Sequence, residues 1–297
     1  MENINKIKFS QKHPVIFGFM LIFSAVVIFM VTMAVFNFFL SDKFRHRTMD
    51  TVGVVNVRGL ISDSREVVDW INELEKKESV RAVIVRINSP GGVVGPSQEI
   101  YSALKRLGEN KTLIASMGSM ATSGGYYVAS PAHKIVSNPG TLTANIGVKA
   151  NLTNMQELLQ KIGIEDQALY TGKYKDAGTV TRPMTDYERE YLQELIDDMH
   201  DQFVQDVASG RNMDPEAVSV LADGRAMTGR QALNVGLVDL LGGMNEAVEL
   251  ARELAGLERE VVLLEGPAEK ISLLRRIVGE FSLVRELTGP GWVFSYE

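Results

Sequence analysis

The sequence predicts an α/β protein built from parallel strand–helix–strand units and preceded by one transmembrane helix. Three observations lead to this fold class. An uncharged apolar run covers residues 15–40. After it, short runs rich in valine and isoleucine alternate with segments whose apolar residues recur at helical spacing. Glycine-bearing corners follow two of the short runs, as they often do at the carboxyl ends of parallel strands.

Residues 15–40 are expected to form an uncleaved, single-pass membrane anchor. A helix of this length can cross a hydrocarbon core of about 30 Å. The run is longer than the apolar region of a signal peptide and ends in bulky aromatic residues. A tail (1–14) precedes it and a linker (41–50) follows. Because lysine or arginine flanks both ends, the positive-inside rule does not choose an orientation.

Residues 51–265 are expected to form one domain in which strands alternate with helices. Strands are predicted over 51–61, 81–88 and 112–119, with further short strands within 133–139 and 143–152. Helices are predicted over 64–80, 96–111 and 185–211. The last of these starts with capping-box spacing at Thr185 and Glu188. Residues 266–297 form a C-terminal extension with an amphipathic helix over 268–287.

The composition of the chain argues against several classes of function. The net charge of −6 argues against a broad nucleic-acid-binding surface. The chain has no cysteine, which excludes disulfides, cysteine zinc sites and thiol nucleophiles. The carboxylates are spread along helices without a ligand cluster such as H-E-x-x-H, so we expect no metal and no other cofactor.

Two glycine corners carry residues suited to acyl-transfer chemistry. They read NSPGG (Asn88–Gly92) and TSGG (Thr122–Gly125). Glycines let a substrate approach the backbone and leave amide N–H groups pointing at it. Ser123 is therefore a candidate nucleophile, with an oxyanion hole made of backbone amides.

The serine needs a base, and histidine is scarce. After the linker only His133 and His200 remain, and both are expected to be structural. This shortage points to a lysine, which must be neutral to act as a base. Its ordinary pKa of about 10.4 would have to fall to roughly 7–8 through burial. Lys173 and Lys175 are candidates because they lie in a glycine-punctuated loop, and the adjacent Asp176 is expected to be solvated or structural.

Six motifs in order resemble a known family. They read INSPGG, MGSMATSGGYYVAS, GTLTANIGV, TGKYKDAG, DQFVQDVASGR and GLVDLLGG, within Thr51–Glu246. Together they are similar to peptidase family S49, the signal peptide peptidases of the SppA type. The resemblance implies a ClpP/crotonase-like fold and a serine endopeptidase acting on remnant signal peptides and other apolar, extended peptides. It also implies a ring-like homo-oligomer in the cell (inner) membrane with an extracytoplasmic catalytic domain.

The resemblance assigns roles to particular residues. Ser123 matches the family nucleophile and Lys175, the second lysine of KYKD, matches the general base. Gly124, with Gly91 or Gly92, matches the oxyanion donors. The chain departs from the family where TANIG replaces the usual TGSIG. Asn145 then stands in place of a serine that contacts the lysine, and its carboxamide oxygen can also accept from Lys175.

Other interpretations remain open at this point. The same peptidase chemistry would serve quality control of membrane proteins. A crotonase-like acyl-CoA enzyme would use the oxyanion corner but does not need Ser123 with Lys175. A non-catalytic membrane scaffold would need neither residue. A ClpP-type Ser-His-Asp site is disfavoured because neither His133 nor His200 has a suitable local context.

Overall fold

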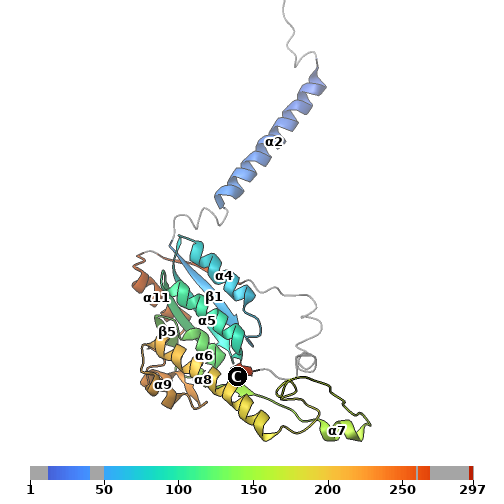
Figure 1. Ribbon diagram of the computed structural model, residues 1–297. Helices are drawn as coiled ribbons and strands as arrows, with labels where there is room; N and C mark the ends of the chain where they lie inside the picture. The colour runs from blue at the N-terminus through green and yellow to red at the C-terminus, as the bar shows by residue number, and fades with distance from the viewer. Residues whose placement is uncertain (1–12, 41–49, 259, 268–293, 297) are drawn as a thin grey trace, which may run out of the picture. The chain divides into compact units, whose positions relative to one another are not determined.

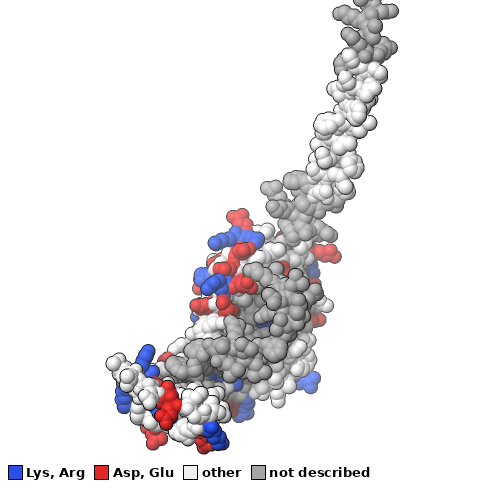
Figure 2. Space-filling view, turned by 90° about the vertical axis from the view of Figure 1, so that its right-hand side faces the viewer, with Lys and Arg blue, Asp and Glu red and all other residues white. Residues whose placement is uncertain are grey.

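Residues 13–40, 50–258, 260–267 and 294–296 are described by the computed structural model of the chain (Figure 1). The chain divides into two units, Met1–Met49 and Asp50–Glu297. In the second unit, Lys and Arg side chains are interspersed with Asp and Glu over the described surface seen in Figure 2.

The first unit contains helix α2 (Pro14–Leu40). Its 27 residues extend roughly 40 Å at the helical rise. Pro14–Asn37 has a mean hydropathy of 2.7 and no part of it is buried. Figure 2 shows no charged side chain on the described part of this helix. The prediction of one apolar helix long enough to cross a membrane is confirmed, by length and composition.

A parallel layer forms the centre of the second unit. Its strands follow the order β10–β1–β2–β4–β5–β9, and every neighbouring pair runs parallel. The bounds are Thr51–Arg58 (β1), Val80–Ser89 (β2), Thr112–Thr122 (β4), Lys134–Ser137 (β5), Leu240–Leu241 (β9) and Val262–Gly266 (β10). Parallel neighbours need crossover connections, which the helices between the strands supply.

Helices cover both faces of this layer. Val83, Val85 and Ile87 of β2 share one core cluster with residues of α4, α5, α6 and α8. Ala82 and Ile84 point to the opposite face and pack with α11. The bounds are Arg65–Lys76 (α4), Val94–Gly108 (α5), Gly124–Ala129 (α6), Asp186–Arg211 (α8) and Met244–Ala255 (α11). Because the strands are buried on both faces, they read in the sequence as continuous apolar runs.

Short elements complete the unit around the carboxyl end of β4. Strand β6 (Leu142–Ala144) pairs parallel with β4, and β8 (Ala226–Thr228) pairs antiparallel with β6. A separate three-stranded sheet has the order β3–β11–β7. Its strands are Gly92–Val93, Phe294–Tyr296 and Lys149–Ala150, in that order. The remaining described helices are α7 (Gln156–Lys161), α9 (Pro215–Leu221) and α10 (Gly229–Asn234).

The predicted elements agree with these bounds to within a few residues. The strands and helices expected between residues 51 and 139 are confirmed, and α8 begins at the predicted capping box of Thr185 and Glu188. Strand β10 is an addition, since no strand was expected beside β1. The helix predicted over 268–287 lies outside the described residues.

Candidate active site

Ser123 lies at the sharp corner between β4 and α6. Its φ of 51° and ψ of −116° form a combination that side-chain-bearing residues rarely adopt. Its N–H donates to the Ala144 carbonyl at 2.7 Å, and its Oγ donates to the Gly147 carbonyl at 3.5 Å. Strained strand-to-helix turns hold the nucleophilic serines of α/β-hydrolases.

Left-handed backbone is concentrated beside Ser123. Among the described residues, positive φ occurs outside glycine at Ser123, Ala144, Asn145 and Asn212. Asn212 caps the end of α8, a usual place for this conformation. The other three meet where the Ser123 N–H bonds to Ala144. Backbone in such sparsely populated regions costs about 1–3 kcal/mol per residue. Strain of this kind persists mainly at functional sites.

The two glycine corners lie against each other. A Cβ added to Gly124 would come within 3.1 Å of the Gly92 nitrogen and 3.2 Å of the Gly91 Cα. A side chain at position 124 would therefore press tightly on the main chain of the other corner, and its Cβ would also lie 2.8 Å from Ser97 Oγ. Gly124 is also the first residue of α6, so its N–H has no intrahelical acceptor. The structure thus brings all three predicted oxyanion glycines together next to Ser123.

Hydroxyl groups hold the corner that follows β2. Ser89 Oγ accepts from the Gly91 N–H at 3.1 Å, and Thr122 Oγ1 donates to the Pro90 carbonyl at 2.9 Å. A Cβ on Gly125 would lie 2.8 Å from the Ser89 carbonyl oxygen. Sequence reasoning missed Ser89 and Thr122. Both could have been found in the sequence, because each is a small hydroxyl residue two positions before a Gly-Gly pair.

An extended segment lies between two strand edges at this corner. Strand β11 pairs antiparallel with β3 on one side and with β7 on the other. Tyr296 is opposite Gly92, and Phe294 is opposite Ala150. The strand that contains one of the glycines beside Ser123 therefore accepts a further strand through main-chain pairing.

Lys175 lies on a segment that we call the arm, residues 151–185, which projects from the layered part of the second unit (Figure 1). Its N–H donates to the Gly172 carbonyl at 3.3 Å, and the residue is exposed. Within the described chain, Lys175 Nζ makes no hydrogen bond or ion pair, and it does not contact Ser123. Lys173 instead lies over the rings of Tyr174 and Tyr187, at 5.0 and 4.5 Å from their centroids.

Asn145 directs its side chain to a different loop. Its Nδ2 donates to the Gly224 carbonyl at 2.5 Å, and its N–H donates to the Arg225 carbonyl at 3.0 Å. The structure therefore gives Asn145 these backbone partners and no contact with Lys175.

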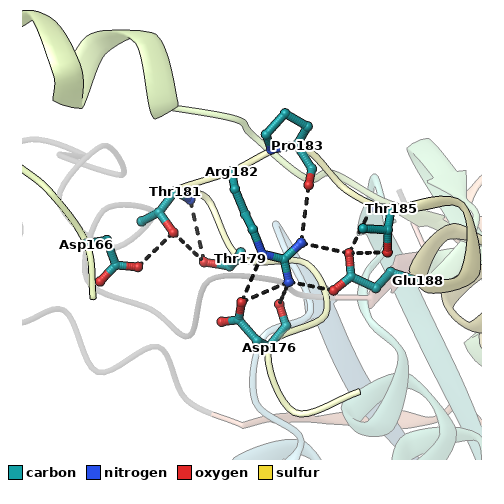
Figure 3. A network of polar contacts seen from close by, with 8 residues as sticks. All are labelled: Asp166, Asp176, Thr179, Thr181, Arg182, Pro183, Thr185 and Glu188. Atoms are coloured by element: carbon teal, nitrogen blue, oxygen red, sulfur yellow. Dashed lines mark hydrogen bonds and ion pairs between the residues drawn. The ribbon is translucent and has the colours of Figure 1, made fainter. Parts of the chain in front are cut away.

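A polar network lies next to Lys175 in the chain (Figure 3). Arg182 donates to the carboxylates of Asp176, at 2.9 Å, and Glu188, at 2.6 Å. The hydrogen bonds from Arg182 and Thr185 lower the pKa of Glu188 to about 2, although burial alone would raise it. Bonding to Glu188 and Asp176 raises the pKa of Arg182. Asp176 is therefore part of an ion-pair network.

The two histidines after the linker bond to backbone groups. His133 Nδ1 accepts from the Leu113 N–H at 2.9 Å, near the start of β4, and Ser123 follows the end of that strand. At the rise of a strand, this separation is roughly 30 Å. A ring nitrogen of His200 lies 2.8 Å from the Ala222 carbonyl oxygen. Both contacts are structural, as expected.

The two tyrosines after Ser123 belong to the core. Tyr126 and Tyr127 are fully buried. Tyr126 Oη donates to the Leu237 carbonyl at 2.9 Å, and Tyr127 Oη donates to the Asp206 carboxylate. Across the part of the chain that the structure describes, no group of three or more His, Cys, Asp or Glu residues could hold a metal ion.

Comparisons with known proteins point to one family. Peptidase family S49 matches residues 105–258. A putative protease of Synechocystis sp. is 40% identical over 80% of this chain and 86% of its own length. The chloroplastic serine protease SPPA of Arabidopsis thaliana is 32% identical over 72% of this chain and 32% of its own. A putative signal peptide peptidase SppA of Enterococcus faecium is 34% identical over 60% of this chain and 52% of its own. Since the family match takes in about half of the chain and includes both Ser123 and Lys175, the chain belongs to peptidase family S49, whose fold is ClpP-like, and it is a peptidase.

Proposed function

We propose that the chain is a membrane-anchored serine endopeptidase with Ser123 as nucleophile and Lys175 as general base. The observation that carries this proposal is the strained corner at Ser123, held against the glycine corner Gly91–Gly92. The proposed substrates are remnant signal peptides and other apolar, extended segments near the bilayer.

The corner geometry suits acyl transfer. Ser123 Oγ attacks the scissile carbonyl carbon while the neutral lysine takes its proton. The N–H groups of Gly124 and Gly92 then donate to the oxyanion, because the Gly91 N–H already donates to Ser89 Oγ. Removing one such donor from a hydrolase typically costs about 3–4 kcal/mol of transition-state stabilisation. The lysine returns the proton to the leaving amine, and water hydrolyses the acyl-enzyme.

A neighbouring copy is the proposed source of the base. The arm exposes apolar side chains that would be covered by a second subunit. They are Leu158, Ile162, Ile164, Leu169 and Tyr170, with exposed fractions between 51% and 101%. Lys175 belongs to the same exposed arm and has no side-chain partner among the described residues. In a head-to-tail ring, each Ser123 would meet the lysine of the next subunit.

The substrate would bind as an added strand. A peptide taking the place of β11 would pair with β3 and β7 and pass beside Gly92. Main-chain hydrogen bonds of this kind give affinity for any extended peptide, and side-chain pockets then select among sequences.

Helix α2 is the proposed anchor. Its length and hydropathy suit one pass through a bilayer. The family resemblance favours the cell (inner) membrane with the catalytic domain on the extracytoplasmic side. Anchoring would bring the site close to membrane-bound apolar peptides.

Cleavage of a fluorogenic apolar peptide by the full chain in detergent tests the proposal. Ser123→Ala and Lys175→Ala should each abolish activity while assembly persists, and Lys173→Ala should keep it as the matched control. Co-expressing the two inactive variants in equal amounts should restore about one quarter of wild-type activity, because a quarter of the sites would combine the intact serine with the intact lysine of a neighbour.

Three results would count against parts of the proposal. Full activity of Lys175→Ala would remove the lysine from the mechanism. Full activity of Ser123→Ala would remove the serine. A silent mixture of two inactive, assembled variants would show that the base comes from the same chain as the serine.

A further inference from the structure

The neighbours of Lys175 on both sides are attached to helix α8, although Lys175 itself is not. The Tyr174 ring stacks on Tyr191, with centroids 4.5 Å apart and planes at 27°. It also meets the edge of Tyr187 at 5.9 Å. On the other side, the Asp176 carboxylate binds Arg182. The turn is therefore fixed at positions 174 and 176, and Lys175 Nζ has no described partner.

Arg182 joins Asp176 of the arm to Glu188 of α8 (Figure 3). Its Nε and Nη2 donate to the same oxygen of Asp176, at 3.2 and 2.9 Å. Nη1 and Nη2 donate to the two oxygens of Glu188, at 2.9 and 2.6 Å. The contact with Glu188 is bidentate, the geometry in which arginine gives both strength and direction and which lysine cannot reproduce.

Glu188 is a rigid support for this arginine. The residue is fully buried and lies in the first turn of α8. One of its oxygens also accepts from the N–H and the Oγ1 of Thr185, at 2.9 and 2.8 Å. Farther along, α8 buries Phe203 and Val207 in the core. Because α8 is packed in the core, its contact through Glu188 and Arg182 fixes the position of the Asp176 carboxylate.

The charges around Lys175 make the position of Asp176 important. Apart from Lys175, the titratable or charged groups on the arm are Glu157, Lys161, Glu165, Asp166, Tyr170, Lys173, Tyr174, Asp176 and Arg182. Those in the first two turns of α8 are Asp186, Tyr187, Glu188, Arg189, Glu190 and Tyr191. Asp176 is the carboxylate next to Lys175 in the chain. An ion pair between them would favour the charged ammonium and remove the neutral amine that a base requires.

We infer that Arg182 is a positioning residue for the catalytic base: it holds the Asp176 carboxylate on α8 and so keeps Lys175 free of an ion pair. The inference rests on the proposed function of Lys175. It assigns Arg182 no contact with the substrate. The effect would act through the protonation of the lysine, so it would appear in the pH dependence of the reaction.

The test is the pH profile of kcat/KM for the full chain in detergent, with a fluorogenic apolar peptide. In Arg182→Gln, the freed carboxylate should move the acidic limb upward by about one pH unit. Activity below the limb then falls about tenfold, with little change at high pH. The double variant Arg182→Gln/Asp176→Asn should return the limb to the wild-type position. Arg106→Gln is the matched control, since Arg106 of α5 also binds two polar side chains, Asn72 and Glu75 of α4, and lies outside the arm.

Other outcomes would overturn the inference. An equal loss of activity at every pH would give Arg182 only a structural role, and an unchanged profile would give it none. If the acidic limb of the pH profile stays shifted in the double variant, the Asp176 carboxylate is not the cause of the shift. Measuring Lys175→Ala alongside distinguishes a failure of the proposed base from a failure of the positioning role of Arg182. Full activity of Lys175→Ala would remove the base itself, whereas an inactive Lys175→Ala with an unshifted Arg182→Gln would remove only the positioning role.

Discussion

The ion pair at the start of α8 predicts how the domain responds to acid. The perturbation is Glu188→Gln. Glutamine keeps an oxygen that can accept from the Thr185 N–H, so the helix cap is retained. The change removes the negative charge that faces Arg182. The variant therefore separates the effect of the Glu188 charge from the effect of its helix-capping hydrogen bond.

The contribution of Glu188 to the free energy of unfolding follows from its pKa. This pKa falls from 4.5 to about 2 in the folded chain, chiefly through the Arg182 hydrogen bond. A carboxyl whose pKa is lowered by folding adds stability above its unfolded-state value and loses it as the pH falls toward the folded-state value. The whole contribution at neutral pH is on the order of 3 kcal/mol. About 2 kcal/mol of it should be lost between pH 7 and pH 3.

Urea unfolding of the full chain in detergent, followed by circular dichroism at several pH values from 7 to 3, measures this difference. Wild type should lose about 2 kcal/mol more than Glu188→Gln over that range. Parallel losses in the two proteins would refute the reasoning, because the ion pair would then contribute nothing that depends on the charge of Glu188.

Two further predictions concern glycine and asparagine positions. Gly210→Ala should lower the free energy of unfolding by about 1–3 kcal/mol, because its Cβ would lie 2.3 Å from the Ser130 carbonyl oxygen. Gly95→Ala, which faces open space in α5, is the control and should stabilise slightly in urea unfolding. Asn145→Ser should leave the activity–pH profile unchanged, since the amide bonds to the Gly224 carbonyl. A shifted profile would show that this side chain reaches the lysine.

The inner strands β1, β2, β4 and β5 of the central layer could be predicted because each carries its own signal, whereas the outer strands β9 and β10 were not predicted. Strand β2 is buried on both faces, and its centre reads as the unbroken apolar run Ala82–Val85. The strands β3, β7 and β11 have two or three residues each, too few to show a period. Their pairing depends on segments far apart in the chain, which local pattern does not specify.

The candidate site was predictable in its residue types and not in its contacts. The glycines around Ser123 indicated a corner open to a substrate, but their approach to Gly91 and Gly92 is a long-range contact. Nothing in the local sequence requires left-handed backbone at Ala144, since alanine favours helix. Arg182 resembled any loop arginine, because its partner Glu188 is buried only after α8 has packed on the core.

The conformation of Ser123 bears on the choice of an inactive protein for binding work. Alanine keeps a Cβ at this position and therefore keeps the strained φ of 51°. Glycine adopts such angles freely and would release strain of about 1–3 kcal/mol. A glycine substitution would thus relax the corner as well as delete the hydroxyl group. Ser123→Ala preserves the backbone conformation of this corner and is therefore the better variant for trapping a complex with an uncleaved peptide.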